Sequence, residues 1–254
     1  MWRYWLLTAG LLSSHSLLAD WQRPSFIAQS FYEVALGSEY GATQLKVHKW
    51  RTPLRIYVEH RVGDQALHDS VLDAHIAHLR AITGLDIQRV TQVAEANVRY
   101  FFTREAELQS LIKRYSGNAA VKHERGAVCM ASIRANLESD IVFAAVYIPV
   151  DRARMHGKLV ACVVEELTQV LGLPRDSEKV FPSIFNDKTP DDLLTGLDDI
   201  LLRILYDPRV VAGMDRSALA PVVSNIISEL GSKGMIKSAE RRVREQSGLY
   251  QLLN

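Results

Sequence analysis

The sequence has few of the features that mark specialised protein classes. It holds only 2 cysteines in 254 residues, and after the N-terminal stretch no segment is apolar for long enough to cross a bilayer. Basic and acidic residues nearly balance, 30 against 29, so the clustered positive charge that nucleic-acid binding needs is not expected. Internal repeats and low-complexity segments are also lacking, which argues against a repeat array. The length suits one domain with a sizeable core, with or without appended helices.

Residues 1–19 have the pattern of a secretory signal peptide. Residues 1–5 give a short, positively charged start, residues 6–18 are mainly apolar, and Ala19 is a small residue before Asp20. The apolar stretch is too short and too polar to anchor the chain, so we expect cleavage and no transmembrane segment afterwards. The mature protein is therefore predicted to be periplasmic or secreted.

Export changes the interpretation of the two cysteines, Cys129 and Cys162. An oxidising compartment favours a disulfide between them. Closing this loop would stabilise the fold by roughly 3 to 4 kcal/mol in the loop-entropy model. The alternative is a pair of buried free thiols, because a sequence does not show whether two Cβ atoms meet.

Hydrophobic periodicity predicts an α+β fold, with helices laid on one twisted mixed sheet. Gly172, followed by Pro174, is expected to end one helix, and Thr189 with Pro190 to start the next. Strands are predicted at 54–59, 86–90, 96–102, 127–133 and 141–150, and helices at 67–83, 105–115, 158–171, 189–206, 217–230 and 236–244.

The helix at 158–171 carries the most informative polar residues. Its apolar positions recur at three- and four-residue spacing and predict a buried stripe. Glu165 and Gln169 are four residues apart and share another face, with Glu166 beside them. By itself this pattern is typical of a solvated helix face.

The order of residues from 165 to 173, Glu-Glu-Leu-Thr-Gln-Val-Leu-Gly-Leu, resembles the zinc-binding consensus of the metzincin peptidases. That consensus is His-Glu-x-x-His-x-x-Gly with a third His shortly after the glycine. Glu165 and Gln169 stand where the first two zinc-binding histidines belong, and Glu166 matches the catalytic glutamate. Gly172 matches the glycine, and Arg175 stands where the third His would be.

Two further segments extend the resemblance. Ser-Ile-Phe-Asn at 183–186 is similar to the segment that forms the methionine turn beneath the metal. Upstream of the helix, the predicted strand at 54–59, helix at 67–83 and strand at 96–102 follow one another in the same order as in that family. The chain from about 50 to 215 also resembles a family of exported bacterial proteins, the domain-of-unknown-function family 2927, through Glu-Glu-Leu-Thr-Gln-x-Leu-Gly-Leu, Ser-Ile-Phe-Asn-Asp and Leu-Tyr-Asp-Pro. The resemblance implies a lead-in at 20–50, a zincin-like domain at 51–215 and C-terminal helices at 216–254.

The departures from the consensus bear on the chemistry. A catalytic zinc usually has three protein ligands, of which only Glu165 would be a good one here. The Gln169 amide is a poor ligand, and the positive charge of Arg175 opposes a dication. We therefore expect no zinc, no other cofactor, and no metal-activated water for Glu166 to deprotonate.

Three roles remain for Glu165, Glu166, Gln169, Arg175 and Asp176. The first is a structural network in which Arg175 pairs with a carboxylate. The second is a cleft that binds an extended chain without cutting it. The third is a metal-free acid/base pair with Glu165 or Glu166 held protonated by burial.

Other chemistry has weaker support. His68, His75 and His78 could converge on one face of the helix at 67–83, but core-edge histidines are commoner than metal ligands. The serines and cysteines show no nucleophile elbow. The sequence thus predicts a non-catalytic binding or assembly module of the cell envelope, with a peptide, a glycan or an envelope protein as partner. The alternative is an unorthodox hydrolase that uses Glu166 as general base.

Overall fold

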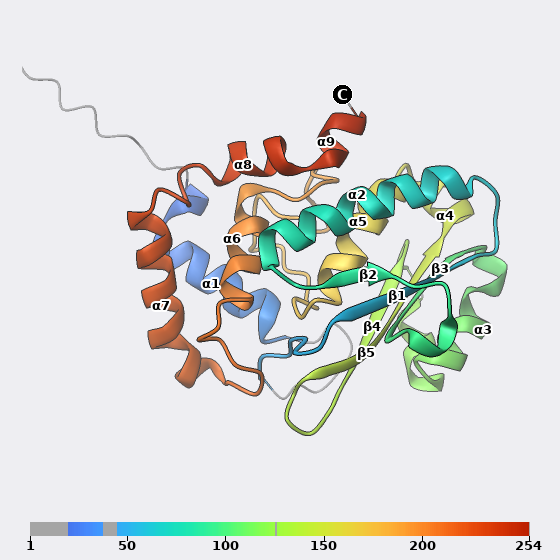
Figure 1. The fold of residues 1–254 in the computed structure, drawn as a ribbon, viewed down its shortest axis with the longest axis horizontal. Coiled ribbons are helices and arrows are strands. Elements are labelled where there is room, and N and C mark those ends of the chain that lie inside the picture. The colour runs from blue at the N-terminus through green and yellow to red at the C-terminus, as the bar shows by residue number, and fades with distance from the viewer. Residues whose placement is uncertain (1–19, 38–44, 125, 254) are drawn as a thin grey trace, which may run out of the picture.

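The computed structural model describes residues 20–37, 45–124 and 126–253 (Figure 1), so the predicted signal peptide at 1–19 lies outside the described residues. It confirms the α+β class. One five-stranded mixed sheet has the strand order β2-β1-β3-β5-β4. The strands are β1 (Leu54–His60), β2 (Ile87–Arg89), β3 (Val98–Thr103), β4 (Met130–Ala135) and β5 (Ile141–Pro149).

The sheet is parallel except at one edge. β1 pairs in parallel with β2 and β3, and β3 pairs in parallel with β5. β4 pairs antiparallel with β5, in a register that sets Met130 opposite Tyr147 and Arg134 opposite Phe143. Among the described strands β4 therefore has one partner, and its other edge is not covered by a strand.

Helices fill most of the remaining described chain, and α1, α4 and α9 among them were not predicted from the sequence. They are α1 (Pro24–Ala35), α2 (Gln65–Thr83), α3 (Glu105–Tyr115), α4 (Val150–Met155), α5 (Leu159–Gln169), α6 (Gly196–Leu205), α7 (Arg216–Ser232), α8 (Ala239–Gln246) and α9 (Gly248–Leu253), with short 3₁₀ helices η1 (Asp20–Gln22), η2 (Val93–Glu95) and η3 (Asn118–Glu124). α3 and α7 lie at opposite ends of the long axis of the molecule (Figure 1). None of the described helices has the length and apolarity needed to span a bilayer.

The two faces of the sheet bury separate cores because successive strand side chains point to opposite faces. The larger core joins β1, β3 and β5 to α1, α2, α5, α6 and α7, and extends from Trp21 to Leu249. The smaller core lies under α3 and consists of Phe101, Leu108, Leu111, Ile112, Met130, Ala145 and Tyr147.

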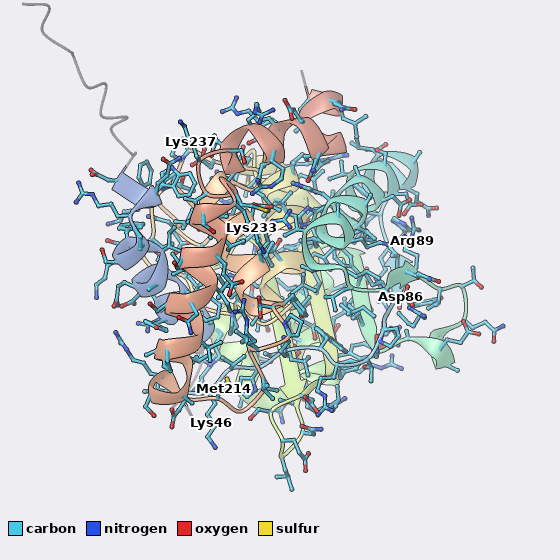
Figure 2. The ribbon with its side chains drawn as sticks, turned by 60° about the vertical axis from the view of Figure 1, so that its left-hand side comes forward. Lys46, Asp86, Arg89, Met214, Lys233 and Lys237 are labelled. Atoms are coloured by element: carbon cyan, nitrogen blue, oxygen red, sulfur yellow. A yellow bond between two sulfur atoms is a disulfide. The ribbon has the colours of Figure 1, made fainter. Side chains whose placement is uncertain are left out.

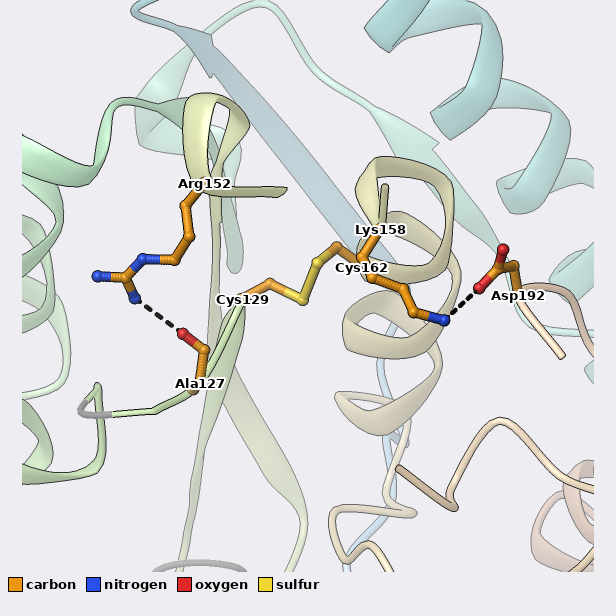
Figure 3. Close-up of a disulfide and its surroundings, with 6 residues drawn as sticks. All are labelled: Ala127, Cys129, Arg152, Lys158, Cys162 and Asp192. Atoms are coloured by element: carbon orange, nitrogen blue, oxygen red, sulfur yellow. Dashed lines mark hydrogen bonds and ion pairs between the residues drawn. A yellow bond between two sulfur atoms is a disulfide. The ribbon is translucent and has the colours of Figure 1, made fainter. Parts of the chain in front are cut away.

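A disulfide joins the sheet edge to α5, which confirms the predicted pairing. Cys129 comes directly before β4, and Cys162 lies on α5, with their Cα atoms 5.8 Å apart (Figure 3). Nearby, Arg152 donates to the carbonyl oxygen of Ala127 and Lys158 pairs with Asp192, so both flanks of the bridge are held by polar contacts. The bridge fixes β4 relative to α5.

The predicted start of the helix at 189 is wrong. α6 begins at Gly196, and its N-cap is Thr195, whose side chain accepts from the backbone of Asp198 in a capping box. Thr189 instead donates to Asp191 at 2.7 Å in a local turn. Thr189 and Thr195 have similar sequence signals for a helix N-cap. The burial of Asp198, which is 0% exposed, decides between them.

Candidate functional site

The helix that carries the predicted site residues, α5, is held from two sides. It packs on β4 and β5 and against α2. Across the α2 contact, His75 Nε2 lies 3.0 Å from Thr168 Oγ1, and Thr168 donates to the carbonyl oxygen of Val164 at 2.6 Å. Because the Thr168 proton is used on Val164, His75 donates to Thr168. This contact fixes the rotation of α5 about its axis.

The C-terminal end of α5 is completed by side chains from distant segments. Trp50 Nε1 donates to the carbonyl oxygen of Val170 at 2.8 Å, and Tyr206 donates to that of Leu171 at 2.6 Å. Gly172 has φ +118°, and a Cβ there would lie 2.1 Å from the carbonyl oxygen of His48. Only glycine fits both the backbone angle and the space, so the chain turns sharply after the helix.

Three carboxylates meet beside this turn. One oxygen each of Glu165, Asp176 and Asp187 lies within 4.8 Å of the others. Gln169 Nε2 donates to Asp176 Oδ1 at 2.8 Å, which ties the loop back to the helix. The structure thus brings together three of the four predicted binding residues, Glu165, Gln169 and Asp176. It adds Asp187, which follows the Ser-Ile-Phe-Asn segment and was not selected from the sequence.

Arg175, the fourth predicted binding residue, points away from this cluster. Its guanidinium lies 3.9 Å from Glu33 on α1, and its side chain is 46% exposed. The stem passes over Gly37, where an added Cβ would lie 2.0 Å from Arg175 Cδ. At this turn Asp176 faces Gln169, and Arg175 faces α1.

The residues present do not fit a zinc peptidase site. Catalytic zinc is usually bound by imidazole nitrogens with a carboxylate or thiolate, and here the clustered groups are three carboxylates. An all-oxygen set suits harder cations, but exposed acidic groups gather commonly without one. Among the described residues the histidines form no such cluster. We derive no catalytic step through a metal.

Glu166, which matches the catalytic glutamate, is buried rather than presented to solvent. Its exposed fraction is 5%, and its charge acts on Tyr100, which is fully buried on β3. Burial, together with this carboxylate, raises the pKa of Tyr100 well above its ordinary value. A general base must reach the proton it removes, and this position faces the sheet.

The segment at 183–186, which resembles the methionine turn, is anchored by one buried carboxylate. Ser183 donates to Asp198 Oδ1 at 2.6 Å, and the backbone N–H of Ile184 donates to Asp198 Oδ2 at 3.2 Å. Asp198 Oδ2 also accepts from the backbone of Thr195 at 2.8 Å. Burial raises the pKa of Asp198 to about 6 although these hydrogen bonds act in the other direction. The segment is held from α6 and contacts the site as a rigid support.

The histidines of α2 belong to the core. His68, His75 and His78 are exposed by 1%, 0% and 2%. Desolvation lowers the pKa of His75 to about 3 and that of His78 to about 4, and it also lowers the pKa of His68. The histidines are therefore neutral groups inside the fold.

A cavity lies along the edge of β4 that no described strand covers, a feature that sequence reasoning missed. We call this cavity, of about 860 Å³, the β4 groove. One wall is the end of α3 with η3, and the other is the end of α5 with the loop that follows it. The described lining residues are Gly37, His48, Arg114–Gly117, Ala119, Ala120, Lys122, His123, Met130–Ala135, Phe143, Gln169, Val170 and Pro174.

The α3–η3 wall of the groove is positively charged. Arg114, Lys122 and Arg134 line it and are exposed, and none forms an ion pair with an acidic residue that the structure describes. No described lining residue is acidic. Sequence composition gave no signal of this wall, because the three residues lie on α3, η3 and β4 and are brought together only by folding.

Comparison with known proteins gives a family and no closer relative. Neither the curated proteins nor the solved structures include a match to the chain. A family model described as protein of unknown function (DUF2927) matches residues 24–225, which is most of the chain and includes the helix, the glycine turn and the carboxylate cluster. The chain belongs to this family.

Proposed function

We propose that this protein is an exported binding module of the cell envelope that holds an extended peptide in the β4 groove without cutting it. The proposal treats the fold as a zincin-like frame that has lost its zinc site. The observation that carries it is the groove of about 860 Å³ along a strand edge that no described strand covers.

An uncovered strand edge is suited to a peptide. It presents a row of backbone N–H and C=O groups, and an added strand satisfies them while its alternate side chains enter pockets on either side. β4 is held in place by its pairing with β5 and by the Cys129–Cys162 bridge to α5. A rigid edge loses little conformational entropy on binding.

The residues at the end of α5 support binding over catalysis. The Gln169 amide donates a hydrogen bond to Asp176, and the Arg175 guanidinium lies near Glu33. Glu166 is buried on the side of α5 that faces the sheet. Hydrolysis by Glu166 would need an activated water at a solvated carboxylate. The disulfide agrees with export, because such bridges persist in oxidising compartments.

Amide hydrogen exchange tests the binding role. An eight-residue peptide of alternating threonine and valine, acetylated and amidated, is added to the protein, and protection of the amides of Met130–Ala135 is measured. We expect added protection in β4 and none in β2, which is the opposite edge of the sheet. The same peptide with alternate backbone nitrogens methylated is the control, and it should give no protection.

Two further measurements separate the module from an enzyme. Purified protein that has met no chelator should contain no stoichiometric zinc. Glu166→Gln should leave peptide protection of β4 unchanged. Peptide cleavage by the native protein that Glu166→Gln abolishes, with unchanged thermal stability, would show that the hydrolase alternative is right.

A further inference from the structure

We infer that the occupant of the β4 groove is an acidic polypeptide segment whose carboxylates occur at every second position. The inference rests on the proposed binding function and adds the chemistry of the partner. It is carried by the cations on one wall of the groove, which have no acidic partner among the described residues, and by the carboxylate cluster behind the other wall.

The cations of the α3–η3 wall differ from their neighbours. Arg152, just beyond the groove, lies 2.7 Å from Glu105 and 2.6 Å from Glu124, so its charge is neutralised within the fold. Arg114 and Arg134 form no ion pair with a described residue and lie against aromatic rings, with Arg114 Cζ 5.3 Å from the Tyr115 ring centre and Arg134 Cζ 4.5 Å from that of Phe143. Their charge is therefore available to a ligand, and positive charges around one cavity reinforce one another.

The alternation of β4 determines where a bound segment must carry its charge. Met130 lies in the core under α3, whereas Ala131 lies in the core toward α5. Ser132 and Arg134 share the α3 side with Met130, and the contact of 2.5 Å between Ser132 Oγ and Ser116 Oγ shows this directly. A strand added to β4 would likewise point every second side chain at the α3–η3 wall.

The other wall disfavours acidic side chains. Its described lining residues are Gly37, His48, Gln169, Val170 and Pro174, none of which is Lys or Arg. Behind Gln169 lies the cluster of Glu165, Asp176 and Asp187, which would repel a carboxylate. The intervening side chains of the segment are therefore neutral or basic, and the expected pattern alternates acidic and non-acidic residues.

The backbone of β4 forms the floor of the groove, and it favours a polypeptide over an anionic glycan. In an antiparallel pair, backbone groups alternate in direction, so every second residue of β4 turns its N–H and C=O away from β5. An extended peptide backbone has complementary groups at the same spacing, whereas a sugar chain does not. The positive charge of the α3–η3 wall and the backbone groups of β4 together specify an acidic polypeptide.

Fluorescence anisotropy with three labelled eight-residue peptides tests the inference. The probes alternate glutamate with valine, group the same residues into a glutamate block and a valine block, or alternate lysine with valine. The alternating acidic probe should bind about tenfold more tightly than its block isomer and more tightly still than the lysine probe. Its affinity should fall as ionic strength rises.

Charge-reversal variants assign the effect to the wall. Arg114→Glu with Arg134→Glu should weaken the alternating acidic probe by at least about tenfold. Lys233→Glu with Lys237→Glu is the matched control, since it changes net charge equally. These lysines lie beside the turn between α7 and α8 (Figure 2), at the far end of the long axis from α3, and should change the affinity less than about twofold. Circular dichroism checks that both variants fold.

Each remaining outcome is decisive. Equal binding of the threonine–valine and glutamate–valine peptides would overturn the acidic partner and leave the proposed function standing. Failure of every peptide to protect β4 would remove the proposed function as well. Tighter binding of a polygalacturonate oligomer, lost in the Arg114 and Arg134 variant, would show that the wall serves a glycan.

Discussion

The two sides of the sheet are built differently. On the α2–α5 side, polar side chains form hydrogen bonds with one another inside the fold. Examples are the bond between His75 and Thr168 and the bond between Gln169 and Asp176. On the α3 side, a small apolar core lies under exposed cations that have no acidic partner among the described residues. The polar groups of α5 are thus engaged inside the fold, whereas the α3 side has basic side chains that are exposed.

The largest predicted effect comes from the disulfide that joins the β4 edge of the sheet to α5. Reduction of Cys129–Cys162 should lower the free energy of unfolding by roughly 3 to 4 kcal/mol, because it releases a loop between residues separated by 33 positions. Urea unfolding with and without a phosphine reductant measures this. The double variant Cys129→Ala and Cys162→Ala should be insensitive to reductant. Two titratable thiols in untreated protein, with no change in midpoint, would contradict the bridge.

The buried His75 predicts that acid lowers the stability of the fold. The pKa of His75 is lowered from 6.5 to about 3 in the fold. The unfolded chain therefore takes up a proton near pH 6.5 that the native state refuses, and the contribution of His75 to stability, present above pH 6.5, is lost as the pH falls toward 3. At pH 5 the loss should be about 2 kcal/mol.

His75→Gln sharpens this test, because it keeps a donor for Thr168 and does not titrate. Its free energy of unfolding should fall less between pH 7 and pH 5 than that of the native protein. Asp198 acts with the opposite sign: its pKa is raised from 3.8 to about 6, so its contribution is present below pH 3.8 and is lost as the pH rises through 6. An identical acid slope in His75→Gln would show that another group controls the transition.

The smallest effect is expected at Arg175, which contrasts with its neighbours in the motif. Arg175→Ala should cost at most about 1 kcal/mol, because its ion pair with Glu33 spans 3.9 Å and the side chain is largely solvated. Gln169→Ala is the comparison, and it should cost about 2 kcal/mol because it removes the hydrogen bond that the buried Gln169 amide donates to a carboxylate. Thermal unfolding of both variants measures the difference. A larger loss in Arg175→Ala would mean that Arg175 does support the cluster.

Local pattern was sufficient for most of the fold. The alternation at 54–59 predicted β1, and the spacing of apolar residues on either side of Glu165 predicted α5 and its buried stripe. Gly172 was correctly expected at the end of that helix. These features depend on backbone geometry and on the separation of polar from apolar residues, both of which are written in consecutive positions.

The candidate site was predicted only in part. Glu165, Gln169 and Asp176 lie together, as their positions in the motif suggested, but Arg175 turns to α1 and Asp187 joins them from a later loop. The direction of a side chain at a turn depends on which element packs beside it. Here Glu33 and Gly37 decide it, and they lie about 140 positions earlier in the chain.

By itself, the sequence determined the α+β class, the helix that carries Glu165 and Gln169, and the pairing of the two cysteines. Only the tertiary structure decided that the N-cap of α6 is Thr195 and not Thr189, because the capping signals are alike and burial of Asp198 separates them. It also decided that β4 is an edge strand with one partner among the described strands and that Arg114, Lys122 and Arg134 gather along it. Both outcomes depend on contacts between distant segments, which local propensity does not encode.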